Sequence, residues 1–373
     1  EISADGTSTA SVDGSLKGAP KDHQNKRELH EQPKPAIQIN EDYVDAPKDR
    51  GNEREVDEEP EPPIQTDEDY DDDIPDVEFE DFEDDDISLS TTPTLKYGTA
   101  WKAERTASLV RQAIHSGFRH IDTACQPKHY NEAGVGEGWK QAALDLDMER
   151  EDFWIQTKFT SLSGQDPNKV PYDKNAKLSD QVRQSVAKSL QNLQTTYIDS
   201  LVMHGMEDSW EKNFEVYNTM EEFVDSGIVK QIGVSNCYDP DAVKYLYENV
   251  RIKPAVVQNR FYADTGHDKE IREFCRMHDI EYQSFWTLTA NPHAWRNDDV
   301  RRLAAEKELS PEDLFYAFVM ELGISPLDGT TDEEHMAEDM ALMKRFRSGE
   351  KIFGSKDEMD LIARKLGLSM TAT

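Results

Sequence analysis

Cysteine is scarce in this sequence of 373 residues, and long apolar runs are absent. Its three cysteines, Cys125, Cys237 and Cys275, show no CxxC spacing, which favours a reducing compartment over a disulfide framework. No apolar run approaches the roughly 18 residues of a membrane-spanning helix. No Asn-x-Ser/Thr acceptor occurs either. We therefore expect a cytoplasmic protein with no membrane partner and no metal site. The sequence begins at Glu1 rather than at a methionine, which leaves an upstream segment open.

Positive charge is also scarce, since 42 Lys and Arg face 76 Asp and Glu for a formal net charge of −34. Nucleic acids and anionic membranes need positive surface, so we expect neither as a partner. Residues 1–90 alone hold 30 acidic and 8 basic side chains. Such a segment buries too little apolar surface to offset its ordering entropy. We predict that residues 1–93 form a disordered acidic tail. It would serve as a solvating spacer or, alternatively, as a docking segment for a basic protein or a sponge for metal ions.

Regular apolar runs begin after about Thr94, where short strand-like runs alternate with amphipathic helical patterns. Expected strands are 95–97, 118–121, 154–158, 199–203, 230–234, 255–258, 280–285 and 324–327. Expected helices are 103–116, 132–144, 179–193, 212–226, 239–249, 268–278, 298–307, 311–322 and 332–346. This order predicts an α/β fold, a (β/α)8 TIM barrel over 94–350 followed by a C-terminal tail at 351–373. A doubly wound sheet is the alternative, but no GxGxxG follows the first strand.

Four polar residues stand at or just after the ends of expected strands: Asp122, Tyr130, Lys158 and His204. The ends of successive strands meet on one face of a barrel, so we expect these side chains to converge. An acid, a phenol, an amine and an imidazole together can form a proton-transfer site. A purely structural role is the alternative for three of them. Asp122 would cap a strand–loop junction, Lys158 would pair with Asp122, and His204 would be a core histidine with satisfied hydrogen bonds.

The sequence resembles the aldo-keto reductase family in several stretches that occur in the family's order. They are GFRHIDTA, YNEAGVGEGW, QTKF, LVMHG, MEEFVDSGIVKQIGVSN, VVQNRFY and GTTDEEHMAED, spanning about 95–345. The resemblance implies a (β/α)8 barrel that reduces a small aldehyde or ketone with a nicotinamide cofactor. We expect the protein to be a monomer. The acidic segment is not covered by the resemblance.

The resemblance assigns a catalytic tetrad to the four strand-end residues. Tyr130 would protonate the carbonyl oxygen during hydride addition, because hydride transfer leaves negative charge there. Lys158 would lower the pKa of Tyr130, and Asp122 would hold Lys158 charged. His204 would orient the carbonyl by a hydrogen bond. The family tyrosine follows the aspartate by about five residues, whereas Tyr130 follows by eight, so this loop must be rebuilt.

Cofactor contacts follow from the same resemblance. Ser235, Asn236 and Gln258 would hold the nicotinamide carboxamide, and Phe285 would stack on the ring. The family's Ser-Pro-Leu becomes Trp286-Thr287-Leu288, which removes expected pyrophosphate contacts.

The segment after the last expected strand bears on the choice of cofactor. NADP-preferring members carry Lys-Ser and, six residues after the lysine, Arg; here these positions hold Gly329, Thr330 and His335. Thr330 and the next helix N-terminus offer backbone N–H groups to a phosphate, and Asp339 would lie near the adenine. We expect NADP(H) as cofactor, with NAD(H) as the alternative.

Two features concern the substrate and the competing function. A polar loop follows Lys158, with Tyr172 as a candidate substrate contact, and Trp210, Phe261, Tyr262, Trp286 and Trp295 are candidates for an aromatic wall. The shifted tyrosine and altered phosphate site favour a second hypothesis. On this second hypothesis, the same barrel binds a nucleotide as a sensor or partner subunit and is only weakly catalytic.

Overall fold

The computed structural model describes residues 34–35 and 93–368, and it confirms the (β/α)8 barrel. Eight parallel strands close in chain order, with β1 paired to β8, which rules out the doubly wound sheet. They are β1 Lys96–Gly98, β2 His120–Asp122, β3 Trp154–Phe159, β4 Ile198–Met203, β5 Val229–Ser235, β6 Val256–Arg260, β7 Glu281–Phe285 and β8 Ile324–Asp328. Each expected strand lies within two residues of the observed bounds. The predicted acidic tail lies almost wholly outside the described residues.

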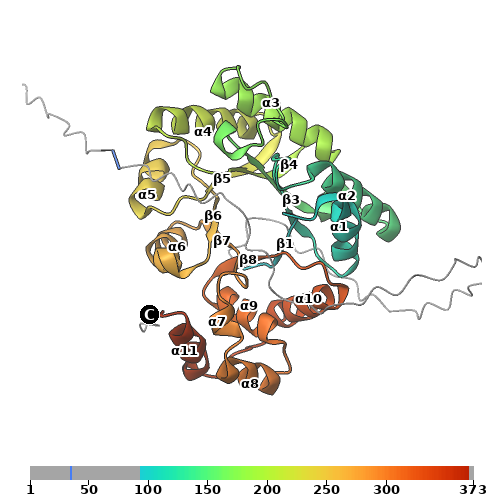
Figure 1. Ribbon diagram of the computed structural model, residues 1–373, viewed down its shortest axis with the longest axis vertical. Coiled ribbons are helices and arrows are strands. Elements are labelled where there is room, and N and C mark those ends of the chain that lie inside the picture. Colours follow the sequence, from blue (N-terminus) through green and yellow to red (C-terminus); the bar gives the residue numbers. More distant parts are fainter. Residues whose placement is uncertain (1–33, 36–92, 369–373) are drawn as a thin grey trace, which may run out of the picture. The chain divides into compact units, whose positions relative to one another are not determined.

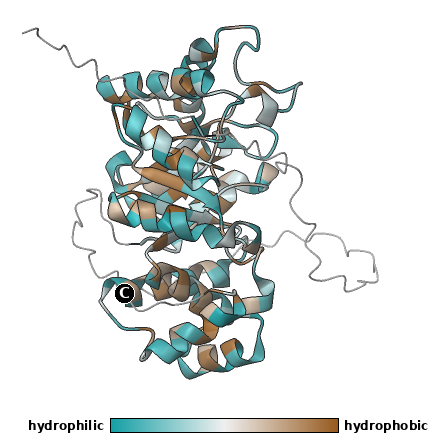
Figure 2. Ribbon diagram, turned by 90° about the vertical axis from the view of Figure 1, so that its left-hand side faces the viewer, coloured by the Kyte–Doolittle hydropathy of each residue, from teal (hydrophilic) through white to brown (hydrophobic). Residues whose placement is uncertain are grey.

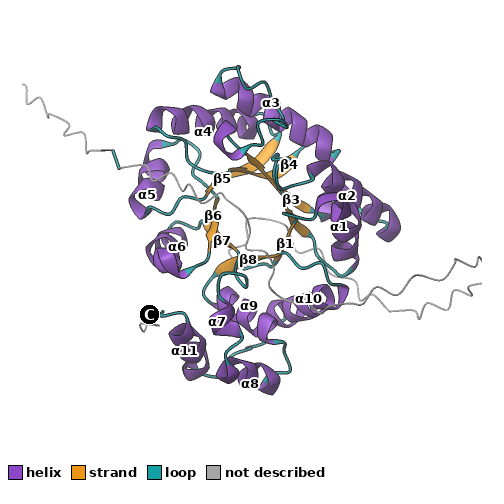
Figure 3. Ribbon diagram, viewed as in Figure 1, coloured by secondary structure: helices purple, strands orange, loops and turns teal. Residues whose placement is uncertain are grey.

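Helices surround the ring of strands (Figures 1 and 3). They are α1 Thr106–His115, α2 Glu132–Leu146, α3 Leu178–Leu193, α4 Trp210–Asp225, α5 Pro240–Asn249, α6 Lys269–Met277, α7 Pro292–Trp295, α8 Asp298–Glu306, α9 Pro311–Glu321, α10 Glu333–Arg347 and α11 Lys356–Lys365. Single turns of 3₁₀ helix occur at Ala103–Arg105, Arg150–Asp152 and Leu162–Gly164, with a longer 3₁₀ segment at Ala263–Asp268. Apolar and hydrophilic residues share the same helices, as amphipathic packing requires (Figure 2).

The glycines of α2 explain why this helix packs so closely at the start of the site. A Cβ at Gly136 would lie 2.1 Å from the Asn192 carbonyl oxygen, and one at Gly138 would lie 2.5 Å from that of Ala107. The helix therefore fits between α3 and α1 only because these positions lack side chains. Asn131 caps it by accepting from the Gly134 N–H. This fixes the residue directly after Tyr130.

The C-terminal segment contains a helix, α11, which the sequence pattern did not reveal. Ile352, Ile362, Ala363 and Leu366 are buried there and join the apolar core. The short helix α7 was likewise not expected. Among the residues described, no helix is both long and apolar enough to cross a membrane.

Candidate active site

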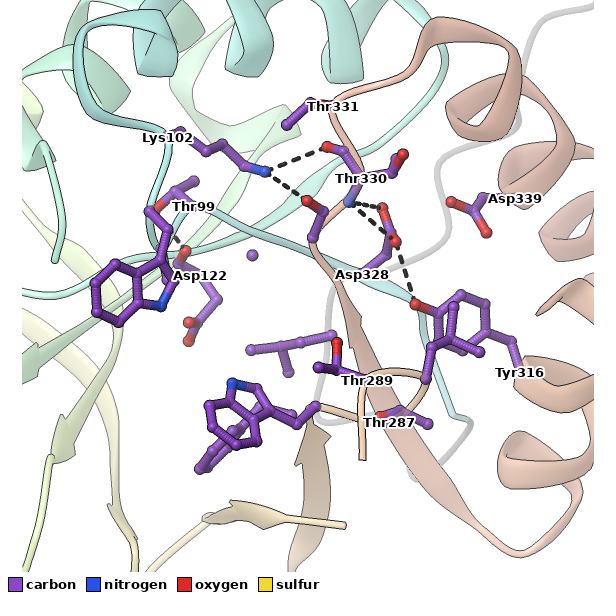
Figure 4. Close-up of a pocket in the computed structure, with 18 of the residues that line it drawn as sticks. Thr99, Lys102, Asp122, Thr287, Thr289, Tyr316, Asp328, Thr330, Thr331 and Asp339 are labelled. Atoms are coloured by element: carbon purple, nitrogen blue, oxygen red, sulfur yellow. Dashed lines mark hydrogen bonds between the residues drawn. The ribbon is translucent and has the colours of Figure 1, made fainter. Parts of the chain in front are cut away.

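A cavity of about 630 Å³ lies at the C-terminal ends of the strands. This is the face on which strand-end side chains converge in a barrel. Asp122, Tyr130 and His204 line it at one end. In Figure 4, Tyr316, Asp328 and Asp339 lie together at one side of the cavity and Asp122 lies at the other. The two ends differ in chemistry.

Asp122 and Lys158 form a buried ion pair beside the cavity. Lys158 Nζ donates to Asp122 Oδ2 at 2.5 Å and to the Thr123 carbonyl at 2.8 Å. Both side chains are almost fully shielded from solvent. Burial lowers the pKa of Lys158, while the Asp122 charge opposes that change. The pair holds an ammonium group in a fixed position beside the ring of Tyr130.

A layer of amide side chains in the barrel interior fixes Asp122 from the other side. Its Oδ1 accepts from Gln156 Nε2 at 2.7 Å and from Gln258 Nε2 at 2.9 Å. Both glutamines also donate to Gln283 Oε1. With Lys158 donating to Oδ2, both oxygens of the Asp122 carboxylate accept hydrogen bonds, and these bonds fix its orientation.

Tyr130 reaches this group from the rebuilt loop. The backbone N–H groups of His129 and Tyr130 both donate to the Gln126 carbonyl, and Gln126 Nε2 donates to the Gly164 carbonyl at 2.8 Å. The turn places the Tyr130 ring 6.0 Å from the His204 ring, and Lys158 Nζ lies 5.4 Å from its centroid. All four predicted catalytic residues are therefore neighbours.

The titration of Tyr130 differs from the sequence expectation. Burial, followed by the negative charge of Asp122, raises the pKa of the Tyr130 phenol well above its ordinary value. Lys158 sits over the face of the ring, and its ammonium donates to Asp122 Oδ2 and to the Thr123 carbonyl. The expectation that this ammonium lowers the pKa of the Tyr130 phenol was therefore wrong. The phenol keeps its proton at neutral pH.

His204 follows β4 and is buried. Its Nδ1 lies 2.7 Å from Thr160 Oγ1, and its backbone N–H donates to the Phe159 carbonyl. Burial, with the nearby charge of Lys158, holds the pKa of His204 well below its usual range. The imidazole is therefore neutral near pH 7.

The residues expected at the nicotinamide meet at the ends of β5, β6 and β7. Asn236, Gln258 and Phe285 line the cavity, while Ser235 is buried behind Asn236 and accepts from its Nδ2 at 3.2 Å. Asn236 Nδ2 also donates to the His204 carbonyl at 2.7 Å. The amide that would meet a cofactor is thus bonded to the backbone of His204, a predicted catalytic residue.

The other end of the cavity is formed by the end of β8 and the first turns of α9 and α10. Thr330, His335 and Asp339 line it as expected, together with Asp328 and Asp313. Tyr316 donates its hydroxyl to Asp328 Oδ1 at 3.1 Å. Burial raises the pKa values of Asp313, Asp328 and Asp339, and the charges of Asp328 and Asp313 raise the pKa of Asp339 further. They share protons rather than carry three full charges.

Comparison with known proteins agrees with this geometry. The aldo/keto reductase family model matches residues 92–350. The chain belongs to this family. It is 27% identical over 255 residues to the 9,11-endoperoxide prostaglandin H2 reductase of Trypanosoma cruzi, covering 66% of this chain and 80% of that protein. It is 26% identical over 276 residues to the NAD(P)H-dependent D-xylose reductase of Pachysolen tannophilus, covering 64% and 81%. The aldose reductase structure from Schistosoma japonicum, at 20% identity, shares the fold with a TM-score of 0.59 over 75% of this chain and 91% of that one.

Aldo/keto reductase membership makes this chain an oxidoreductase, and the cavity shows where it departs from sequence expectation. Of the five proposed wall aromatics, Trp286 lines the cavity, whereas Trp210 and Phe261 are buried elsewhere. The Tyr172 hydroxyl donates to the Thr160 carbonyl at 2.8 Å, which makes it a loop anchor. Among the described residues, no group of three or more His, Cys, Asp or Glu side chains could hold a metal ion.

Several residues that line the cavity were not predicted from the sequence, among them Trp101, Lys102, His129 and Arg260. The rings of Trp101 and His129 pack against each other, with centroids 3.8 Å apart and planes tilted by 42°. Arg260, the last residue of β6, places its guanidinium 4.1 Å from the Trp286 ring. Lys102 Nζ donates to the Gly329 and Thr330 carbonyls. The sequence signal for Arg260 was its position, since it lies just after the expected strand 255–258, as the predicted catalytic residues lie at or after theirs.

Proposed function

We propose that this aldo/keto reductase reduces an aldehyde or ketone to an alcohol with NADPH or NADH, using Tyr130 as proton donor. The observation that carries the proposal is the convergence of four groups on one cavity wall. Lys158 is paired with Asp122 at 2.5 Å and lies 5.4 Å from the Tyr130 ring centroid, and that ring lies 6.0 Å from His204.

The residues around the cavity fit a nicotinamide dinucleotide. Phe285 offers a flat aromatic face, and Asn236 and Gln258 offer amides beside it. Gln258 Nε2 is committed to Asp122 and Gln283, so its carbonyl oxygen is the atom left to accept from a carboxamide. A volume of about 630 Å³ suits a ligand of this size class. When bound, the dinucleotide supplies the hydride.

The side chains handle the proton. As hydride adds to the carbonyl carbon, the carbonyl oxygen gains an electron pair and takes the proton from the Tyr130 hydroxyl. Burial keeps that proton in place at neutral pH by raising the pKa of the phenol. The Lys158 ammonium then stabilises the phenolate that forms.

His204 supports orientation. In the proposed mechanism the Thr160 hydroxyl donates to Nδ1, 2.7 Å away, so that the neutral imidazole carries its proton on Nε2. That N–H can donate to the carbonyl oxygen and hold it near Tyr130. The neutral state is consistent with the lowered pKa of His204.

The test follows loss of cofactor absorbance with a panel of aldehydes and ketones. Tyr130→Phe should lower turnover by about 100-fold or more while leaving dinucleotide binding intact. Tyr247→Phe, which removes a hydroxyl on the outer helix α5, is the matched control and should turn over normally. Equal turnover by Tyr130→Phe and wild type would show that another acid serves.

A second function is favoured by one specific feature. Lys158 lies over the face of Tyr130 rather than at its hydroxyl, which is poor activation for a catalyst. On this reading the barrel binds a nucleotide as a sensor or partner subunit. Measurable dinucleotide binding with no turnover on any carbonyl would support it.

A further inference from the structure

The inference concerns which dinucleotide the cavity accepts, and it rests on the proposed function. If Phe285, Asn236 and Gln258 receive the nicotinamide, an extended dinucleotide must place its adenosine at the opposite end. That end is built by Asp328, Thr330 and the start of α10. NADP(H) and NAD(H) differ there by one group, a 2′-phosphate on the adenosine ribose. The question is whether this end can hold a dianion.

The backbone N–H groups at this end already have carboxylate partners. The Thr330 N–H donates to both Asp328 oxygens, at 3.2 and 3.0 Å. The Glu334 and His335 N–H groups donate to Asp332 Oδ1, at 2.9 and 3.3 Å. A helix N-terminus binds phosphate through such groups. Here the chain's own acids occupy them.

Among the described residues, few basic side chains line this end of the cavity, and Lys102 already donates hydrogen bonds there. Lys102 Nζ donates to the Gly329 and Thr330 carbonyls at 2.8 and 3.2 Å, and burial lowers its pKa to about 8. Figure 4 shows this ammonium reaching the backbone at Thr330, on the side away from Asp328. His335 is the other basic residue lining this end, and Gly329 carries no side chain.

Acids outnumber these cations around the same space. The carboxyl groups are those of Glu312, Asp313, Asp328, Glu338 and Asp339. A 2′-phosphate would add a dianion beside them in a partly buried region, where like charges repel strongly. A ribose 2′-hydroxyl would instead donate a hydrogen bond to a carboxylate, which is how acidic residues select the unphosphorylated ribose.

We propose that this end of the cavity rejects a 2′-phosphate, so that the protein binds NAD(H) in preference to NADP(H). Asp328 and Asp332 act by occupying the N–H groups that a phosphate would need. Glu312 and Glu338 act by their negative charge, and the carboxyl oxygens of Asp328 and Asp339 offer acceptors to the ribose.

The experiment measures dissociation constants of the full chain for NADH and NADPH by isothermal titration calorimetry, without substrate. We expect NADH to bind roughly tenfold or more tightly, because charge-assisted pairing to a 2′-phosphate is lacking. The double variant Gly329→Lys/His335→Arg should tighten NADPH binding and reverse or close the gap, with NADH binding within a few-fold of wild type. A Cβ at Gly329 meets no atom within 4 Å, so the new side chain has space.

Ala305→Lys/His293→Arg is the matched control, because it makes the same charge change on exposed residues of α8 and α7. It should leave both dissociation constants unchanged, and thermal unfolding should show that each variant is folded. NADPH binding as tight as or tighter than NADH binding in wild type would overturn the inference and leave the proposed function standing. Binding of neither dinucleotide would overturn the proposed function, and the inference with it.

Discussion

The two ends of the cavity use charge in opposite ways. At the end that holds Asp122, the buried ammonium of Lys158 is matched by that carboxylate, and two glutamines complete the carboxylate's bonding. At the far end, Asp313, Asp328 and Asp339 crowd together, and burial raises the pKa of each. One end therefore fixes the position of a matched ion pair, whereas the other gathers several carboxyl groups around protons that they share.

Breaking the matched pair should have the largest effect. Lys158→Met leaves Asp122 charged in a site shielded from solvent, which typically destabilises a fold by about 3–5 kcal/mol. Turnover should also be lost, since the positive charge near Tyr130 goes with it. Urea unfolding and a turnover assay measure the two losses. Recovery of stability in Asp122→Asn/Lys158→Met is the control. Wild-type stability of the single variant would show that the pair is not coupled.

Removing Arg260 should weaken both dinucleotides without changing their ratio. Its guanidinium lines the cavity 4.1 Å from the Trp286 ring, and we expect its charge to pair with the pyrophosphate that both cofactors share. Loss of a charge-assisted contact in Arg260→Gln predicts roughly tenfold to hundredfold weaker binding. Calorimetry with NADH and NADPH measures it. A change in the ratio alone would place Arg260 at the selective end instead.

The cluster of Asp313, Asp328 and Asp339 should make the free energy of unfolding depend on pH. Because the pKa of Asp339 is raised, the folded chain keeps a proton that the unfolded chain releases above its ordinary pKa. Stability therefore falls as pH rises from about 5 to 8, by up to about 1.4 kcal/mol per pH unit. Asp339→Asn should remove this slope in urea unfolding and gain most over wild type at the highest pH. Exposed Asp264→Asn is the control. Parallel curves for wild type and Asp339→Asn would contradict the proton-sharing cluster.

The smallest effect should come from Asp332. Asp332→Asn keeps a side chain that can cap α10 but removes its charge from the first turn. NADPH affinity should rise by a few-fold, the scale of about 0.3–1 kcal/mol for a charge at a helix end, with NADH affinity unchanged. Paired titrations of both cofactors measure it. An equal rise for both would mean that Asp332 acts on the adenosine as a whole.

Much of the catalytic end was predictable because it depends on strand ends. Asp122, Lys158 and His204 each stand at or just after the end of a short apolar run, and parallel strands in a closed barrel bring such positions together. Tyr130 needed the family resemblance, and its place depends on the Gln126 turn, which no pattern in the sequence marked.

The rest could not be predicted because it depends on packing between elements. Asp313, Asp328 and Asp339 come from α9, β8 and α10, and nothing local distinguishes them from solvated acids. Asp328 accepts from the Thr330 N–H, which the sequence alone had offered to a phosphate. The predicted direction of the Tyr130 pKa shift was wrong for the same reason, because the burial of the phenol and the position of the ammonium over its ring depend on packing between elements.

The most direct measurement of the central claim is isotope transfer. The protein is mixed with NADH carrying deuterium at the transferable position and with each aldehyde of the panel in turn, and the products are analysed by mass spectrometry. We predict deuterium on the carbinol carbon with wild type and with Tyr247→Phe, and its near absence with Tyr130→Phe at equal dinucleotide occupancy. Unlabelled aldehyde recovered from wild type with bound dinucleotide, across the whole panel, would contradict the account.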